Sequence, residues 1–341
     1  SNLLNPNISM IGDIRANLGR DFEPDARAFQ LHEAEIGIQA PIDPYARADA
    51  FIAISPEEGI DLEETYITFQ TLPAGIQAKV GKFRSNFGKF NRVHLPETQF
   101  GDRPLVTQTY FGEEGLAGVG ISLSVLVPNR WVYLNLDVEA TSTPEEAPAF
   151  GLEPPPAPGG AASEEELITG GRRRDLMYLS RLGTFLDLGE SANITLGGTY
   201  ATGVYDGAGS LRMHLQGIDV TLRWQPPRRA IYKSVLWQTE VLLGQRESVG
   251  GGFTNTLGLF SFVDWQFSRR WHIGSRYDYT QFPDSSSSYE EGVLGFLAFA
   301  PSEFTSISWQ ARGVRRVDGS WHGVGMVKLT FNIGPHGAHP F

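Results

Sequence analysis

The histidines of this sequence are the side chains best suited to catalysis or metal binding, and their spacing argues against both. Four of them fall in segments far apart in the chain, namely His32, His214, His272 and His322. No Gly-x-Ser-x-Gly motif, which would position a nucleophilic serine, is present. His336 and His339 have the spacing His-x-x-His, but a zinc site needs a third protein ligand nearby. The chain has no cysteine, which excludes thiolate catalysis. We therefore expect no enzyme, no metal site and no cofactor.

The charged residues between positions 82 and 116 suggest a different chemistry, the electrostatic selection of ions. The side chains that we predict to form a pore constriction are Lys82, Arg84, Lys89, Arg92, His94, Arg103, Glu113 and Glu114. A ring of Arg or Lys at a narrow point favours anions, and a ring of Asp or Glu favours cations. Basic groups dominate the first two thirds of this segment, so we expect a modest preference for anions. In the alternative that the sequence leaves open, the basic groups pair with nearby carboxylates and only hold the segment in place.

The elements that must position these residues are β-strands. Apolar and polar residues alternate in most segments, as in 119–127 and 132–140, which places one set of side chains on each face of a strand. Turn signals such as Asp43-Pro44 and Pro226-Pro227 separate these segments. Counting between the turn signals predicts about sixteen antiparallel strands of roughly 10 residues, the length that a tilted membrane strand requires.

A transmembrane barrel and a soluble sandwich both have one apolar face per strand, and three features favour the barrel. Short connections alternate with longer ones, as expected when all short turns lie at one end. Aromatic residues lie beside the short connections, where a membrane interface would be: Tyr45, Trp131, Trp224 and Trp271. The polar faces also carry charges of both signs, which a water-filled lumen would hydrate. Those that we predict to line the lumen are Arg15, Lys79, Arg181, Arg223, Glu240, Asp264, Arg276, Asp278, Arg312 and Lys328.

Composition and charge exclude several other classes of protein. The 341-residue chain has a formal net charge of −11 and an isoelectric point near 5.2, which argues against nucleic-acid binding. No segment approaches the roughly 20 consecutive apolar residues of a helical membrane span. The first alternating run begins by Ile8, so we do not expect the N-terminal plug of a TonB-type receptor.

The run from Val80 to Asn91, VGKFRSNFGKFN, is similar to a Gly-x-x-Lys-x-x-Phe-Gly element of outer-membrane porins. The chain resembles most nearly the broad phosphate-selective-porin-like group. Its last alternating run, 327–333, and its terminal Phe341 resemble the C-terminal signature of Gram-negative outer-membrane barrels. The resemblance implies an all-β barrel in the Gram-negative outer membrane, with a loop after the fifth strand folded into the lumen. It also implies contact with lipid and lipopolysaccharide, insertion by the barrel-assembly machinery, and a homotrimer.

We accordingly expect one barrel domain over residues 1–341. A constriction loop would cover about residues 84–116, and a long extracellular loop would cover about residues 143–174, where Pro-rich, acidic and Arg172–Arg174 stretches follow one another. The expected function is that of a porin that lets small hydrophilic solutes or ions diffuse passively. One alternative is a structural sleeve around a partner protein, which would need a wide lumen. Another is a barrel enzyme, which would need a cluster of Ser, His and Asp at the outer rim.

Overall fold

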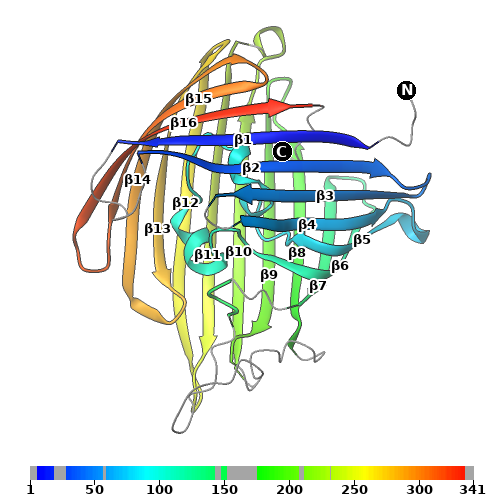
Figure 1. Cartoon of the computed structure of the whole chain (residues 1–341). Helices are drawn as coiled ribbons and strands as arrows, with labels where there is room; N and C mark the ends of the chain where they lie inside the picture. The colour runs from blue at the N-terminus through cyan, green and yellow to red at the C-terminus, as the bar shows by residue number, and fades with distance from the viewer. Residues whose placement is uncertain are drawn as a thin grey trace.

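The chain forms a closed barrel of sixteen antiparallel strands, as predicted (Figure 1). The computed structural model describes residues 6–18, 28–56, 59–142, 147–151, 175–206, 211–230 and 232–334. Each strand pairs with its neighbours along the chain, and β1 closes the ring by pairing with β16. The strands are β1 Asn7–Asn17, β2 Phe29–Pro41, β3 Ala46–Ser55, β4 Gly59–Phe69, β5 Ile76–Arg84, β6 Ala117–Leu126, β7 Tyr133–Thr141, β8 Met177–Asp187, β9 Ala192–Val204, β10 Arg212–Trp224, β11 Ser234–Glu247, β12 Phe253–Ser268, β13 Trp271–Phe282, β14 Ser285–Ser302, β15 Thr305–Arg315 and β16 Trp321–Ile333.

The alternation of apolar and polar residues sets the two faces of the barrel wall. In β10, Met213, Leu215 and Asp219 point inward and are buried, whereas Ile218 points outward and is 63% exposed. Other outward-facing apolar residues, such as Val119 and Val293, are also more than half exposed. The outer surface of the barrel is therefore apolar, and the charges are turned inward.

Aromatic residues gather at the end of the barrel where the short turns lie. Trp131 is 89% exposed and Tyr45 is 66% exposed. Trp271, at the start of β13, packs against Phe299 and Trp309, with ring centroids 4.7 Å and 6.3 Å apart. Such a belt of aromatic side chains is typical of a membrane interface.

The predicted alternation of short and long connections holds only in part. At the end opposite the short turns, residues 56–58 alone join β3 to β4, and residues 283–284 alone join β13 to β14. Strand β14 begins at Ser285, so the serines at 285–288 belong to the strand and not to a loop. The serines of this segment continue the strand because its pairing with β13 extends to Phe282.

Several predicted features lie outside the described residues. They are most of the loop at about 143–174, with its arginine run Arg172–Arg174, and the C-terminal tail with His336, His339 and Phe341. None of the helices in the described part of the chain is long and apolar enough to cross a membrane.

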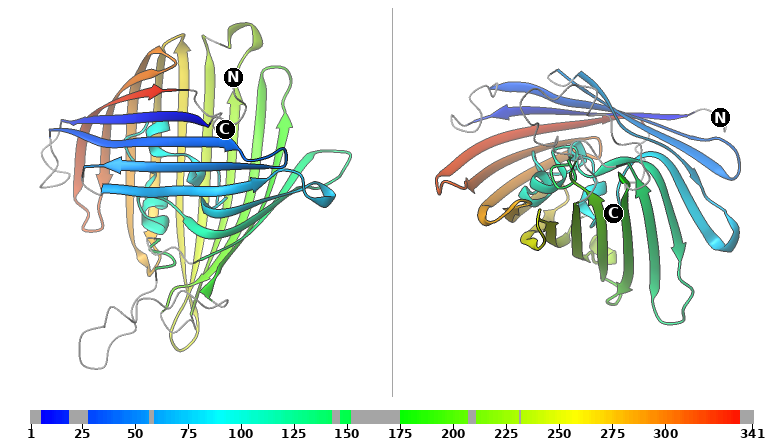
Figure 2. Two further views of the ribbon diagram at one scale, coloured as in Figure 1. Left: turned by 45° about the vertical axis from the view of Figure 1, so that its right-hand side comes forward. Right: turned by 90° about the horizontal axis from the view of Figure 1, so that it is seen from below.

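Residues 85–116, here called the inner loop, connect β5 to β6 and lie within the ring of strands. Seen from below, the cyan segments of this loop and its helix α1 (Leu105–Phe111) lie inside the barrel (Figure 2). Helix α1 contacts β12, β13 and β14. The strand from which the loop starts is β5, the fifth, as predicted from the sequence.

Glycines bring β5 close to its neighbours where the inner loop begins. Gly81 has a φ of 140°, which favours glycine, and a Cβ there would clash with the backbone oxygen of Thr65 on β4. Its partner on β6 is Gly120, where a Cβ would clash with the backbone oxygen of Ala140. The wall beside the inner loop therefore depends on residues without side chains.

We predict that Gly81→Ala destabilises the barrel by about 2 kcal/mol or more, because the new methyl group meets backbone that cannot move independently. The measurement is the denaturant midpoint of the detergent-solubilised protein, followed by tryptophan fluorescence. Gly183→Ala on β8 is the control, because no atom lies within 4 Å of its Cβ position. Equal midpoints for the two variants would show that the close approach at Gly81 does not exist.

Candidate functional site in the barrel lumen

Strand β16 holds the inner loop through one buried lysine. The Nζ atom of Lys328 donates to the carbonyl oxygens of Leu95, Thr98 and Phe100, each at 2.9 Å. The same ammonium lies 3.6 Å from a carboxylate oxygen of Asp13 on β1. A loop of irregular backbone cannot pair its own carbonyls, and buried carbonyls without partners are costly. Lys328 satisfies three of them at once.

Carboxylates of other strands bind the first residues of the inner loop. Glu240 on β11 accepts hydrogen bonds from the backbone N–H groups of Lys89 and Phe90, both at 2.8 Å. Glu139 on β7 accepts from the backbone N–H of Asn86 at 3.2 Å. These glutamates thus bind loop backbone rather than a solute, although Glu240 was predicted to line the lumen.

A third anchor joins Asp102 of the inner loop to β13 and β15. Arg276 donates to an Asp102 carboxylate oxygen at 3.1 Å and to the Asp102 carbonyl oxygen at 3.0 Å, and Arg312 pairs with the same carboxylate. Asp278 pairs with Arg276 at 2.8 Å. Burial opposes the charged carboxylate, but the two guanidinium groups hold the pKa of Asp102 below its usual value.

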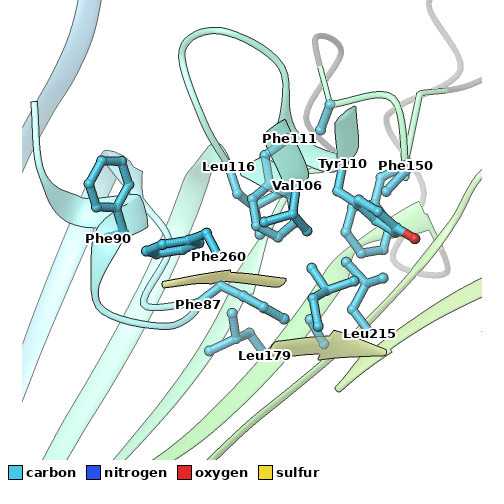
Figure 3. Packing of buried hydrophobic residues seen from close by; sticks show 14 of the residues in the cluster. Phe87, Phe90, Val106, Tyr110, Phe111, Leu116, Phe150, Leu179, Leu215 and Phe260 are labelled. Carbon is cyan, nitrogen blue, oxygen red and sulfur yellow. The ribbon is translucent and has the colours of Figure 1, made fainter. Parts of the chain in front are cut away.

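An apolar cluster fills the part of the lumen enclosed by β8–β14. Aromatic side chains of the inner loop pack there against inward-facing residues of the wall (Figure 3). The rings of Phe90 and Phe260 have centroids 5.4 Å apart, and those of Phe100 and Phe296 are 5.6 Å apart. Tyr110 is fully buried and donates its hydroxyl to Thr256 on β12. This side of the lumen is therefore packed like a protein core.

The opposite side of the lumen contains a polar cavity of about 340 Å³ between β1–β5 and the inner loop. We call it the lumenal cavity. Its polar lining includes Gln39, Arg47, Asp49, Tyr66, Thr68 and Lys79. Arg47 and Asp49 pair with each other at 2.5 Å. The cavity reaches inward as far as Glu64 and His94.

Four of the predicted cations lie in the lumen without a carboxylate within 4.0 Å in the described part of the chain. They are Lys79 and Arg92, which line the lumenal cavity, and Lys89 and the fully buried Arg103 in the inner loop. The ammonium of Lys79 lies 4.1 Å from the centroid of the Tyr66 ring, which is a cation–π contact rather than an ion pair. Burial and the neighbouring charges of Arg223 and Arg92 lower the pKa of Lys89 to about 8.

Other predicted constriction residues hold the protein together. Arg84 pairs with Glu63 at 2.9 Å and with Glu114 at 3.5 Å, and Arg103 donates to the carbonyl oxygen of Glu113 at 2.6 Å. Arg84 and Arg103 are both buried, while the Glu113 side chain is exposed. Arg84 thus pairs with carboxylates, as in the alternative that the sequence left open, whereas Arg103 binds a backbone carbonyl of its own segment.

Lys82 lies instead on the opposite face of β5. It shares a face with the exposed Val80, whereas Lys79 and Phe83 share the inward face, and its ammonium is 3.7 Å from Asp61. A period of two predicts this position for Lys82, but it would place Arg84 on the same face, and Arg84 is instead buried against Glu63 at the end of the strand.

The remaining residues predicted to line the lumen are largely paired with one another or with their neighbours. Arg15 pairs with Asp13 at 2.7 Å, and Arg181 pairs with Asp219 at 2.6 Å. Asp264 lies 3.0 Å from His272. Arg223 is half-buried on the inward face of β10. The inner charges are thus balanced mainly by protein partners rather than by water alone.

A buried cluster around His94 lies at the inner end of the lumenal cavity. Its Nδ1 atom lies 2.9 Å from a carboxylate oxygen of Glu35 on β2 and 2.6 Å from one of Glu63 on β4. Its Nε2 atom lies 2.9 Å from Glu64 on the same strand. Burial and Arg84 oppose a second proton on the ring, but the surrounding carboxylates outweigh both and raise the pKa of His94 well above its ordinary value.

Sequence reasoning found His94 but missed the glutamates around it. Glu63 and Glu64 are adjacent in β4, and strict alternation would turn only one of them inward. Pairing with β3 shifts between Phe51 and Ile52, so Glu63 is the extra residue of a β-bulge and both side chains enter the lumen. The sequence did contain one signal of this bulge, a pair of adjacent glutamates inside an otherwise alternating strand.

The histidines outside the inner loop show no catalytic triad within the described ranges. At the turn between β15 and β16, Ser320 lies 2.8 Å from His322 and donates to Asp318. Asp318 thus contacts the serine rather than orienting the histidine ring, which is the wrong order for a triad. His214 contacts Tyr200.

Comparison with known proteins gives both a sequence relative and structural neighbours. An uncharacterized protein of Aquifex aeolicus (strain VF5) is 30% identical over 355 aligned positions, which cover 93% of this chain and 71% of that protein. This chain belongs to the same family. No family model matches it.

Solved structures show the same fold at low sequence identity. An anion-selective porin from Comamonas acidovorans has a TM-score of 0.62 and 10% identity, over 96% of this chain and 100% of that one. OmpT of Vibrio cholerae, an outer membrane protein solved in a trimer form, has a TM-score of 0.56 and 8% identity, over 96% and 100%. The fold of this family is therefore that of the outer-membrane porins.

The contacts of Lys328 predict a local effect of its removal. In Lys328→Met, the carbonyls of Leu95, Thr98 and Phe100 lose their donor and Asp13 keeps only Arg15 as a cation, so we expect residues 93–101 to lose about 3–5 kcal/mol of protection against hydrogen exchange. The measurement is hydrogen–deuterium exchange with mass spectrometry. Lys233→Met, an exposed lysine in a short turn, is the control. Unchanged exchange in 93–101 would show that Lys328 does not hold the inner loop.

Proposed function

We propose that this protein is a porin of the Gram-negative outer membrane, through which small hydrophilic solutes or ions diffuse passively. The observation that carries the proposal is the lumenal cavity, a polar space on one side of a lumen that is enclosed by an apolar outer wall. A barrel of sixteen strands is wide enough to leave an aqueous channel, in contrast to barrels of eight. The aromatic belt at the short turns supports a membrane location.

The inner loop is the proposed constriction. It fills the side of the lumen at β8–β14 with its aromatic residues, so solutes would pass on the other side, along β1–β5. Residues 1–341 form one barrel domain in this proposal, with the loop at about 143–174 on the extracellular side. The inward position of the inner loop counts against a sleeve, because a partner protein needs a wide lumen.

We propose a preference for anions, carried by Lys79, Lys89 and Arg92 rather than by Arg84 and Arg103. The first three are cations without an ion-pair partner in the described chain, so their charge acts on a passing ion. Screening is weak in a narrow passage of low dielectric. Arg84 is neutralised by Glu63 and Glu114, and Arg103 is fully buried, so neither guanidinium faces a passing ion. Residues 80–91 resemble the phosphate-selective-porin-like group, which agrees with a preference for anions. Phosphate is therefore the first oxyanion to test.

Partners follow from the same proposal. The apolar outer wall would contact outer-membrane lipid and lipopolysaccharide, and the barrel-assembly machinery would insert the chain. Assembly as a homotrimer is proposed by analogy with the trimer form of the Vibrio cholerae protein. The role proposed for the protein includes no catalysis and no energy coupling.

Replacing the unpaired cations should reverse the ion preference. In a planar bilayer with asymmetric KCl, we expect the wild-type reversal potential to have the sign of an anion-preferring pore. Lys79→Glu, Lys89→Glu and Arg92→Glu should each move it toward the cation sign, and the triple variant should invert it. Repeating the measurement with potassium phosphate in place of KCl tests the oxyanion.

Lys82→Glu is the matched control, because it makes the same charge change on the outward face of the same strand. An equal shift in Lys82→Glu would show that the effect is not local to the lumen. A wild-type reversal potential of cation sign would refute the anion preference alone. Absence of any conductance would refute the porin and favour the sleeve.

A further inference from the structure

Three buried atoms at the inner end of the lumenal cavity converge on one point. They are the Oε2 atoms of Glu35 and Glu63 and the Nδ1 atom of His94, and all three lie within 4.8 Å of one another. Their side chains are more than nine-tenths buried. The contacts between them are short, at 2.6 and 2.9 Å, yet none of the three atoms makes a hydrogen bond in the described structure. The three atoms thus lie at ion-pair distance from one another, and the described structure gives them no other hydrogen-bond partner.

The opposite sides of two of these groups are held in place. The Nε2 atom of His94 donates to Glu64 at 2.9 Å, which leaves Nδ1 as the atom that faces the two carboxylates. The Oε1 atom of Glu63 accepts from Arg84 at 2.9 Å, which leaves Oε2 on the inner side. A histidine whose far nitrogen is bound by a carboxylate is the usual arrangement around a protein-bound metal, because it fixes both the tautomer and the ring orientation.

The charges of the cluster also call for a cation. Glu35, Glu63 and Glu64 are buried around His94, and Arg84 is bonded to Glu63 through its guanidinium and to Glu64 through its backbone N–H. Three carboxylates and one guanidinium leave a negative excess in a site of low dielectric, where unbalanced charge is strongly unfavourable. A second proton on His94 would supply one positive charge, and a divalent ion at Nδ1 would supply two.

We propose that Glu35, Glu63 and His94 bind one divalent first-row transition-metal ion. An imidazole nitrogen with two carboxylate oxygens suits Zn²⁺ and its neighbours better than Mg²⁺ or Ca²⁺, which prefer oxygen ligands alone. Three protein ligands leave a further position for water, and the lumenal cavity, which both Glu35 and His94 line, supplies the access. No metal site was expected from the sequence, because the three ligands come from segments that are far apart in the chain, namely β2, the bulge of β4 and the inner loop.

The site would bind the inner loop to the wall on the polar side of the lumen. His94 belongs to the loop, whereas Glu35 and Glu63 belong to strands, so one ion would bridge all three segments. Lys328, Glu240 and Arg276 hold the loop against β11–β16. The metal would be a corresponding attachment to β2 and β4.

The test is metal binding by the folded barrel in detergent, measured by calorimetry with Zn²⁺ and by the visible spectrum of bound Co²⁺. All measurements use a His336→Ala/His339→Ala background, because the His-x-x-His pair in the tail could bind metal by itself. We expect one equivalent of Zn²⁺ in this background and none in Glu35→Gln or His94→Ala. Glu64→Gln, which removes only the orienting carboxylate, should weaken binding about 10–100-fold.

His272→Ala is the matched control, because His272 also pairs with a carboxylate, that of Asp264, but has no third ligand in the described structure. It should bind Zn²⁺ like the background protein. No binding by the background protein would overturn the proposal and leave a second proton on His94 as the balancing charge. Undiminished binding in folded Glu35→Gln would overturn the proposed ligand set. Conductance plays no part in these readouts, so the porin proposal stands or falls separately.

Discussion

The interior of this barrel depends on charged wall side chains that bind the backbone of a loop. A segment of irregular structure inside a barrel has carbonyl and N–H groups that neither lipid nor a regular sheet can satisfy. Lys328 supplies hydrogen bonds to three carbonyls, and Glu240 accepts from two N–H groups. Because these contacts are buried or partly buried, the loop can remain in the lumen with these polar groups paired.

The two sides of the lumen differ because the inner loop is attached mainly to one of them. Its aromatic residues cover the apolar inward faces of β8–β14, as at Phe260 and Phe296, which would otherwise be exposed to water. The polar faces of β1–β5 remain uncovered and form the lumenal cavity. The same division leaves Lys79 and Arg92 beside that cavity, whereas Arg276 is paired with Asp102 of the inner loop.

The sixteen strands could be predicted because a period of two in apolar residues is a strong and repeated signal. The pairing of the lumenal charges could not. Arg84 and Lys89 look alike in sequence, yet one is buried against Glu63 and the other has no ion-pair partner in the described chain, a difference set by contacts between strands far apart. A signal for the packed side did exist. In β12, Phe260 points inward and Val263 points outward, so both faces of this strand carry apolar residues. Such a pattern is typical of a strand that is buried on both sides.

The inner loop contacts residues that are far away in the sequence, and this sequence separation bears on the order in which the barrel assembles. Lys328 and its carbonyl acceptors are separated by as many as 233 residues, and those of Glu240 by about 150. Strands β5 and β6, which carry the loop, pair with each other locally, but the partners that dock the loop belong to the last third of the chain. Contacts of such long range form late, because chain closure must precede them. The contacts of Lys328 therefore form last, because they require β16, the strand whose pairing with β1 closes the ring.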